Sequence, residues 1–418
     1  EGKLRKDIFL ERAIVEERIK LAMGGDKKNP NVIEVIEIAC DECPVSGHVV
    51  TESCRGCLAH RCEDVCRRGA ITFDEQQKAH IDKSKCVECG QCAKVCPYSA
   101  IINQERPCEK ACKIKAISMS SEEHRAAHID NEKCISCGAC VYQCPFGAIV
   151  DKSFILDAVN LIKGSHENQD YKVYAVVAPS ISSQFSYAKL GQVITGIQRL
   201  GFYHVIEAAL GADMVAYKEA AELAEKGFLT SSCCPAFVEY VRKNHPEYMD
   251  HVSTVVSPMI AMARAIRAKD RKARIVFIGP CAAKKLEASR RSIRSDVDFV
   301  LTFEELRAIL DARGLELAEM PEITAGEPSS YGRIFARTGG VAESVRRVAK
   351  LEGIETEINP IRCSGIEECI KTMKLASFGR LEENLIEGMA CKGGCTNGAA
   401  SIFHDQRGIQ RVNDFSRL

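Results

Sequence analysis

The chain has 418 residues, of which 46% are hydrophobic and 27% are charged, and its 57 basic and 57 acidic residues balance to a formal net charge of zero. This composition excludes a disordered or collagen-like chain, and the charge balance argues against bulk electrostatic binding of nucleic acid. No apolar run reaches the roughly 20 residues that a membrane-spanning helix needs. The 23 cysteines are unusual in a long chain whose first residues do not resemble an export signal, so we expect a cytoplasmic protein with metal-binding thiols.

The first element predicted along the chain is a charged helix over residues 4–23, which we interpret as a packing or partner helix. Residues 36–150 then hold 16 of the 23 cysteines, in four units that each contain two cysteines spaced four apart. The phrase Ala-His-Ile-Asp-x-x-x-Cys begins at residue 79 and again at residue 127. This region therefore consists of two tandem copies of a two-unit module.

Two of the units are complete runs of the form C-x-x-C-x-x-C-x-x-x-C-P, at residues 86–97 and 134–145. In bacterial ferredoxins, the first three thiolates of such a run bind one 4Fe–4S cluster and the fourth binds the neighbouring cluster. Zinc ribbons instead use paired C-x-x-C motifs. The spacing therefore favours iron–sulfur clusters over zinc.

The other two units are incomplete. The first has two extra residues between Cys57 and Cys62, and the third lacks its leading C-x-x-C, which we infer is supplied by Cys40 and Cys43. Unligated buried thiols are the alternative for that pair. The crossed rule then predicts four ligand sets with no cysteine left over: Cys54, Cys57, Cys62 and Cys96; Cys66, Cys86, Cys89 and Cys92; Cys112, Cys134, Cys137 and Cys140; and Cys40, Cys43, Cys108 and Cys144.

Residues 151–418 alternate short apolar strands with helices, which is typical of an α/β domain with parallel sheets. The predicted strands are residues 172–178, 274–278 and 299–302. The predicted helices are residues 153–163, followed by a polar turn, and then 215–226, 259–268 and 303–313. Thr302 and Glu305 form a capping box at the start of the last helix. We expect a helical segment (1–35), a ferredoxin-like domain (36–150) and an α/β domain (151–418).

Three segments of the α/β domain carry cysteines in unusual contexts. Residues 231–237 read S-S-C-C-P-A-F, residues 279–287 read G-P-C-A-A-K-K-L-E, and residues 387–398 read E-G-M-A-C-K-G-G-C-T-N-G. Glycines let the backbone approach a bulky inorganic ligand, and a helix N-terminus after Cys281 would favour its thiolate. Four thiolates from three loops predict one more cluster, buried between sheets.

These segments resemble the signature loops of the iron-only (FeFe) hydrogenases, whose usual forms are T-S-C-C-P-x-W, M-P-C-x-x-K-x-x-E and E-x-M-A-C-x-G-G-C. The cysteine-rich region is similar to the family's electron-input module. The resemblance implies a two-lobed α/β domain with parallel sheets around an H-cluster, fed by four additional 4Fe–4S clusters. The implied reaction is the reversible combination of two protons and two electrons into H2. The implied partners are ferredoxin or a similar one-electron carrier and the maturation proteins that assemble the H-cluster.

The resemblance also implies a role for each matching residue. The 4Fe–4S part of the H-cluster would be held by Cys234, Cys281, Cys391 and Cys395. Cys395 would also bridge to a two-iron subcluster bearing CO, cyanide and an azadithiolate. Cys233 would donate a proton to the bridging amine, and Lys284 would hydrogen-bond a cyanide. The other positions matched to the cofactor are Ala178, Pro179, Ser180, Pro235, Pro280 and Met389.

Glu219 and Glu222 lie three residues apart, so they share one face of the predicted helix. With Ser257 they match the family's proton path from Cys233 to the surface, and Lys226 stands at its outer end. On the residue pattern alone, a solvated helix face is the alternative for the two carboxylates.

The chain departs from the family's usual residues at several positions, as in divergent subgroups. Ser231 replaces Thr, Phe237 replaces Trp, and Gly279 replaces a Met. Cys363 and Cys369 match no signature, and we expect them to be buried, inert thiols. Two other functions stay open: a hydrogenase-like iron–sulfur assembly protein without the two-iron unit, which the presence of Cys233 and Lys284 disfavours, and a non-catalytic H2 sensor.

Overall fold

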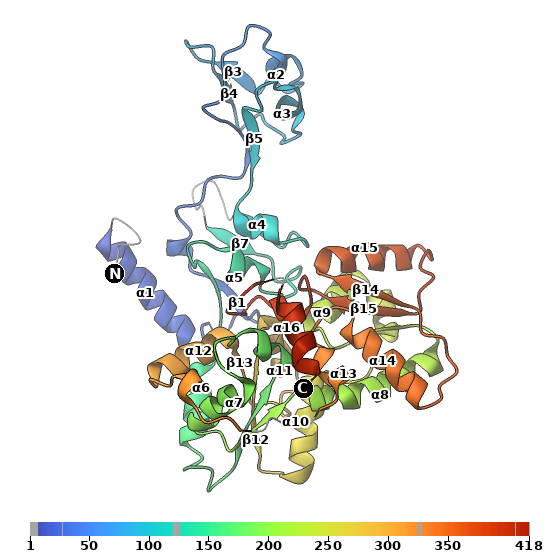
Figure 1. Cartoon of the computed structure of the whole chain (residues 1–418). Helices are drawn as coiled ribbons and strands as arrows, with labels where there is room; N and C mark the ends of the chain where they lie inside the picture. Colours follow the sequence, from blue (N-terminus) through green and yellow to red (C-terminus); the bar gives the residue numbers. More distant parts are fainter. Residues whose placement is uncertain are drawn as a thin grey trace.

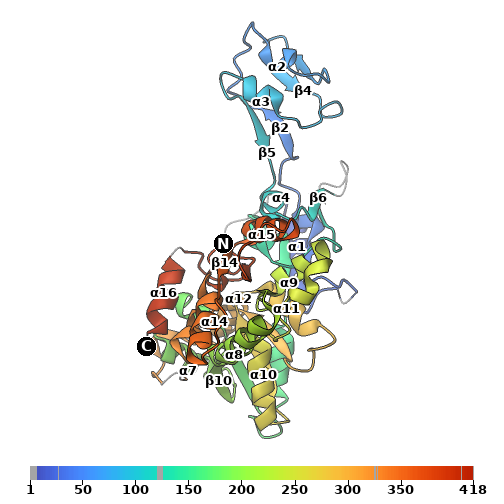
Figure 2. The ribbon, with the colours of Figure 1, turned by 90° about the vertical axis from the view of Figure 1, so that its right-hand side faces the viewer.

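The computed structural model describes residues 7–26, 28–119, 126–323, 326, 328–405 and 407–417. A small lobe projects from the rest of the molecule and is connected to it by the paired strands β2 and β5 (Figures 1 and 2). Below it lie the remaining cysteine-rich elements, which pack on a larger α/β part.

The cysteine-rich region is built from short helices and two-stranded antiparallel ribbons, in which β1 pairs with β8, β2 with β5, β3 with β4 and β6 with β7. Its strands are β1 Ile33–Val35, β2 Gly47–Val50, β3 Ile71–Phe73, β4 Ala79–Ile81, β5 Ile101–Gln104, β6 Ile117–Met119, β7 Ala127–Ile129 and β8 Ile149–Asp151. Its helices are α1 Ile8–Ala22, η1 Glu37–Ala39, α2 Arg61–Asp64, α3 Gln91–Val95, α4 Pro107–Ala111 and α5 Ala139–Gln143. The repeated Ala-His-Ile phrase forms β4 and β7, so both copies of the predicted module have the same local structure.

The predicted N-terminal helix is present as α1, whose first predicted residues, 4–6, lie outside the described part of the chain. Its side chains Ile14 and Leu21 are buried against the cysteine-rich core, as expected for a packing helix. Because β1 pairs with β8, the residues beside the two predicted domain boundaries, at 35 and 150, lie next to each other in space. The division itself stays a prediction.

The first half of the α/β part is a four-stranded, all-parallel sheet with the order β10-β9-β12-β13. Its strands are β9 Val173–Val177, β10 His204–Glu207, β12 Arg274–Gly279 and β13 Phe299–Thr302. Its helical elements are α6 Ile155–Lys163, η2 Pro179–Ser183, α7 Leu190–Arg199, α10 Pro258–Lys269, α12 Phe303–Ala312 and η4 Leu317–Glu319. All three predicted strands are confirmed. The capping box of α12 is also confirmed, since the Glu305 amide donates to Thr302 Oγ1 at 3.1 Å.

The second half is a three-stranded parallel sheet with the order β11-β15-β14. Its strands are β11 Leu229–Thr230, β14 Pro360–Ser364 and β15 Leu385–Met389. The remaining helical elements of the α/β part are α8 Ala209–Lys226, α9 Pro235–Asn244, η3 Pro246–His251, α11 Ala282–Ser289, α13 Ser330–Ile334, α14 Gly340–Leu351, α15 Ile366–Ser377, η5 Cys395–Asn397 and α16 Arg407–Ser416. The sequence did not predict these strands, because β11 is two residues long and β15 contains Glu387 and Gly388, which are uncommon in strands.

The predicted fold class is confirmed: ferredoxin-like ribbons precede an α/β part with two parallel sheets. In each of the three cysteine-bearing segments, the cysteines follow the carboxyl end of a strand, namely β11, β12 and β15. Ligand sites in open α/β sheets lie at this edge. Two sheets that face each other at these edges can therefore bring three distant loops together.

Candidate active site

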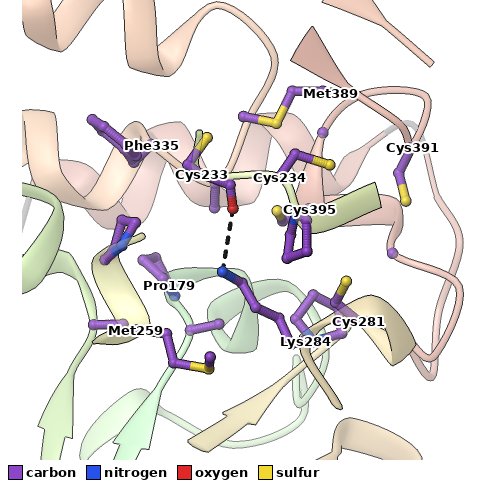
Figure 3. Close-up of a pocket in the computed structure, with 18 of the residues that line it drawn as sticks. Pro179, Cys233, Cys234, Met259, Cys281, Lys284, Phe335, Met389, Cys391 and Cys395 are labelled. Carbon is purple, nitrogen blue, oxygen red and sulfur yellow. Dashed lines mark hydrogen bonds between the residues drawn. The ribbon is translucent and has the colours of Figure 1, made fainter. Parts of the chain in front are cut away.

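A buried cavity lies where these three loops meet (Figure 3). About 790 Å³ of space lies between the surrounding atoms, solvent at its mouth included, and apolar atoms form nearly all of its wall. The cysteines that line it are Cys233, Cys234, Cys281, Cys391 and Cys395. All five cysteines of the three segments thus reach one cavity.

The thiols of Cys234, Cys281, Cys391 and Cys395 are arranged around a common space, whereas the Cys233 thiol points away from it towards Phe335 (Figure 3). Burial raises the pKa of Cys281 to about 11 and that of Cys395 to about 12. Thiolates in such a place need a cationic partner, and iron supplies one.

A cluster fits this donor set better than a single ion does. Within the described ranges, no three His, Cys, Asp or Glu side chains close around one metal ion. The ligand sulfurs of a cubane bind different iron atoms and stand farther apart than the ligands of one ion. The cavity volume and the four converging thiols therefore suit an iron–sulfur group.

Lys284 extends into the cavity from α11. Its Nζ donates hydrogen bonds to the carbonyl oxygen of Cys233 at 3.2 Å and to Glu287 Oε2 at 2.6 Å. Burial by itself lowers the pKa of Lys284, but attraction to Glu287 outweighs burial, so the pKa is raised and the ammonium is kept. Glu287 was not predicted as a site residue, although it lies one helical turn after Lys284, where side chains meet.

Five of the six positions matched to the cofactor line the cavity: Ala178, Pro179, Pro235, Pro280 and Met389. Ser180 does not line it and is fully buried at the start of η2. The sequence did not single out Met259, Phe277 and Phe335, which supply much of the apolar wall. Their only sequence signal is hydrophobicity, which does not distinguish a cavity wall from a core.

The departures from the usual family residues have structural explanations. A Cβ atom at Gly279 would lie 2.6 Å from the Phe277 ring, so this ring requires glycine there. A Cβ atom at Gly388 would overlap the ring of Phe237, which is completely buried. Ser231 retains a hydroxyl, and its Oγ accepts a hydrogen bond from the Gly388 amide at 3.1 Å.

Glu219 lies on α8 behind Cys233. It is completely buried, and neither carboxyl oxygen has a hydrogen-bond partner within the described residues. Burial raises the pKa of Glu219 to about 8, so the acid is neutral at pH 7. The pKa of Cys233 is raised by burial first and by Glu219 second, which indicates that the two groups are close. The solvated-face alternative for Glu219 is therefore excluded.

Glu222 is 9% exposed and is held by several donors. Its Oε2 accepts from the Ser253 hydroxyl at 2.7 Å, and its Oε1 accepts from the Thr254 amide at 2.9 Å. Lys226 Nζ lies 2.9 Å from Glu222 Oε1, and the lysine side chain is 29% exposed. These contacts continue from the buried end of α8 towards the surface.

The hydroxyl beside the two carboxyl groups belongs to Ser253 and not to the predicted Ser257. Ser253 bonds Glu222 and also lowers the pKa of Glu219. Ser257 is the N-cap residue of α10, and its Oγ is buried without a partner in the described part of the molecule. Both serines lie in one short loop, so residue spacing could not decide between them.

The cysteine-rich region brings together two of the predicted ligand sets completely and members of the other two. One hollow is lined by Cys66, Cys86, Cys89 and Cys92. Another is lined by Cys112, Cys134, Cys137 and Cys140. In the other two sets the thiols influence one another. The pKa of Cys62 is raised by burial and then by the neighbouring thiols of Cys57 and Cys96. The pKa of Cys108 is raised to about 11 by burial and then by neighbours that include Cys40 and Cys144.

The set of Cys112, Cys134, Cys137 and Cys140 adjoins the cavity. Burial raises the pKa of Cys137 to about 12, and Cys281 contributes to the shift. A Cβ atom at Gly138 would lie 2.8 Å from the Cβ of Ala399, so the two loops touch. The pKa of Cys140 in turn responds to Cys108, which links this set to that of Cys40 and Cys43.

No helix in the part of the chain that the structure describes is long and apolar enough to cross a membrane.

Two known hydrogenases are similar to a large part of this chain. Iron hydrogenase 1 of Clostridium pasteurianum is 27% identical over an alignment of 308 positions, which covers 60% of this chain and 54% of that protein. This chain thus spans about half the length of that relative. The periplasmic Fe hydrogenase large subunit of Nitratidesulfovibrio vulgaris is 28% identical over an alignment of 385 positions, which covers 78% of this chain and 86% of that protein.

A third relative has a different name. The Cytosolic Fe-S cluster assembly factor NAR1 of Sclerotinia sclerotiorum is 36% identical over an alignment of 132 positions, which covers 27% of this chain and 23% of that protein. Among solved structures, a variant of the FeFe-hydrogenase HydA1 of Chlamydomonas reinhardtii superposes with a TM-score of 0.53 at 21% identity, over 64% of this chain and 88% of that one. This structural likeness shows the fold alone.

Family models cover both parts of the molecule. Residues 53–100 match a 4Fe-4S dicluster domain, and residues 127–150 match a 4Fe-4S binding domain. Residues 171–399, more than half of the chain, match the model described as iron only hydrogenase large subunit, C-terminal domain. With its ferredoxin-like 4Fe–4S domains and its α/β part, the chain belongs to the iron-only hydrogenase family.

Proposed function

We propose that this chain is an iron-only hydrogenase that interconverts H2 with two protons and two electrons. The observation that supports the proposal most directly is the convergence of four thiols from three loops on one cavity, with the thiol of Cys233 free beside them. An H-cluster bound there would supply the metal centre at which protons are reduced.

The proposed ligands of the H-cluster are Cys234, Cys281, Cys391 and Cys395, with Cys395 also reaching the two-iron unit. The apolar wall keeps bulk water out. The Lys284 ammonium, retained by Glu287, supplies a hydrogen-bond donor where anionic ligands such as cyanide would lie. A buried ammonium is stable only with such partners.

The proposed proton route runs along α8. A proton enters at Lys226, passes to the carboxyl of Glu222 and crosses the Ser253 hydroxyl to Glu219. The carboxyl of Glu219, neutral below pH 8, then donates to Cys233 Sγ, and Cys233 lines the cavity. Groups with pKa values near the working pH transfer protons efficiently in both directions.

The proposed electron route uses four 4Fe–4S clusters in the cysteine-rich region. The interactions between neighbouring sets support an order of transfer. Electrons would pass from the cluster of Cys40, Cys43, Cys108 and Cys144 to the cluster of Cys112, Cys134, Cys137 and Cys140. The second of these clusters would then pass them to the cavity. A one-electron carrier such as ferredoxin would supply them, in the cytoplasm, and maturation proteins would build the H-cluster.

Iron–sulfur cluster assembly is the second candidate function, because one segment of the chain is similar to an assembly factor. The buried Glu219 behind Cys233 argues against it, since a protein without proton turnover has no use for an unpartnered acid in this place. Sensing of H2 without turnover is a third candidate.

Infrared spectroscopy on the anaerobically matured protein tests the proposal. We expect the stretching bands of metal-bound CO and cyanide together with H2 evolution from reduced methyl viologen. Cys233→Ala should retain these bands and lose H2 evolution by roughly 100-fold or more. Absence of the bands after loading with a synthetic two-iron unit would contradict the proposal and favour cluster assembly, and bands without H2 turnover in the unaltered chain would favour sensing.

A further inference from the structure

Residues 47–104, called the distal lobe here, stand apart from the rest of the molecule on the ribbon of β2 and β5 (Figures 1 and 2). The lobe carries two of the four ligand sets. We call Cys54, Cys57, Cys62 and Cys96 the first cage, and Cys66, Cys86, Cys89 and Cys92 the second cage. Electrons from outside have to reach one cage before the other.

The second cage is open to solvent. Cys89 is the one exposed cysteine among the 23 of the chain. The same hollow is lined by Val87, which is 57% exposed, and by Arg67 and Arg68. All four cysteines of the first cage are only partly exposed. An approaching protein can therefore come closest to the second cage.

The charges around the second cage are not balanced within the lobe. Most acidic side chains of the lobe are paired internally, for example Glu88 with Lys83 at 3.2 Å and Glu52 with Lys78 at 3.4 Å. Arg67 and Arg68 are exposed and form no salt bridge with any residue that the structure describes. The hollow beside Cys89 therefore presents two arginines to solvent.

We propose that this hollow, formed by Cys66, Arg67, Arg68, Val87 and Cys89, is the docking surface for an acidic protein that carries one electron. Arginines attract an acidic surface and orient it, while Val87 provides an apolar contact at the centre. In the step that follows docking, the carrier loses one electron and the cluster of the second cage gains it, and no bond forms or breaks. The inference rests on the proposed function in one respect: the electrons received here are then used for H2 turnover.

Arg55 and Arg61 provide a matched control, because they are equally exposed and lie beside Cys54, Cys57 and Cys62 of the first cage. The probe is flavodoxin hydroquinone, an acidic one-electron donor whose oxidation to the semiquinone is visible by absorption. Stopped-flow mixing with protein that contains its 4Fe–4S clusters gives the second-order rate constant without any H2 turnover.

We expect Arg67→Glu/Arg68→Glu to lower this rate constant by about tenfold at low salt, and the loss to shrink at high salt. Arg67→Gln/Arg68→Gln should give an intermediate loss, and Arg55→Glu/Arg61→Glu should stay within about twofold of the unaltered chain. Reduction by methyl viologen, a small cation, should not slow in any variant, which shows that the clusters are intact.

An unchanged rate constant in Arg67→Glu/Arg68→Glu overturns the assignment. So does an equal or larger loss in Arg55→Glu/Arg61→Glu, which would place docking at the first cage. Failure of the proposed function has a different signature, because a chain that makes no H2 from methyl viologen would still oxidise flavodoxin through the second cage.

Discussion

Burial and hydrogen-bond partners set the protonation state of the two acids on α8. The carboxyl of Glu219 is buried without a partner within the described residues, so it stays protonated. Glu222 is one helical turn away and has a lowered pKa: burial would raise it, but the Thr254 amide and the Lys226 ammonium outweigh burial. The two acids therefore differ in charge at neutral pH, so Glu219 can donate a proton and Glu222 can accept one.

Glu219→Gln should lower H2 evolution by roughly 100-fold or more, because an amide cannot pass on a proton. In the unaltered chain the pKa of Glu219 is raised to about 8, so the donor form persists below that pH and declines above it. H2 evolution with reduced methyl viologen should therefore hold up to about pH 8 and then fall by about tenfold per pH unit. Glu225→Gln, on the exposed face of the same helix, is the control and should be neutral. Equal rates for the Glu219→Gln and Glu225→Gln variants would contradict the route.

Ser253→Ala should slow H2 evolution by about tenfold or more, since its hydroxyl bonds Glu222 and acts on Glu219. Ser257→Ala is the control, because it removes a hydroxyl from the same loop that has no hydrogen-bond partner among the described residues. It should change the rate of H2 evolution by less than about twofold. Initial rates on matched iron content compare the two. The opposite ranking would return the hydroxyl step to Ser257.

At the scale of elements, residues of the cysteine-bearing segments also hold helices and strands in place. Glu387 belongs to the third cysteine-bearing segment, yet its carboxylate caps α14, accepting from the amides of Gly339 at 2.6 Å and Ala342 at 2.9 Å. Gly388 lets β15 pass directly over the Phe237 ring of α9. The loop that follows β15 is thus positioned by packing one and two residues before the strand ends.

Gly388→Ala should destabilise the protein by about 1–3 kcal/mol, because the added methyl group overlaps a buried ring. Gly326→Ala is the control, since a Cβ there meets no atom of the described residues nearer than 4.0 Å. Thermal unfolding under anaerobic conditions measures the difference. Combining Gly388→Ala with Phe237→Leu should recover part of the loss. Equal midpoints for the two alanine variants would show that the ring moves aside at no cost.

At the scale of the whole molecule, the proposed function has electrons and protons reach the cavity from different sides. The cysteine-rich region adjoins the loops of Cys281 and Cys391, while α8 leads from Cys233 to the surface at Lys226. The distal lobe extends the electron route outward (Figure 1). Separate routes allow the cavity itself to stay closed to water.

Cys40→Ser should lower the iron content by about four atoms per chain, since it removes one ligand of a cluster. Its partners Cys43, Cys108 and Cys144 cannot complete the set. Cys363→Ser is the matched control: Cys363 is buried like Cys40, and its Sγ bonds Thr372 Oγ1 at 3.3 Å, outside all four sets. Iron analysis with spectra of the reduced protein distinguishes the two. Full iron content in Cys40→Ser would reject its assignment as a ligand.

The sequence by itself determined whatever depends on near neighbours in the chain. The ferredoxin-type runs, the three cysteine-bearing segments, the strands β9, β12 and β13 and the capping box of α12 all follow from short spacings, because the local backbone positions residues that are a few positions apart. Only the tertiary structure decided what depends on distant contacts. The meeting of three loops in one cavity and the ligand set of Cys40, Cys43, Cys108 and Cys144 were already predicted from the motifs, and the set stays a prediction. The burial of Glu219 and the placement of the Ser253 hydroxyl beside Glu222 result from the packing of sheets and helices, which residue spacing does not encode.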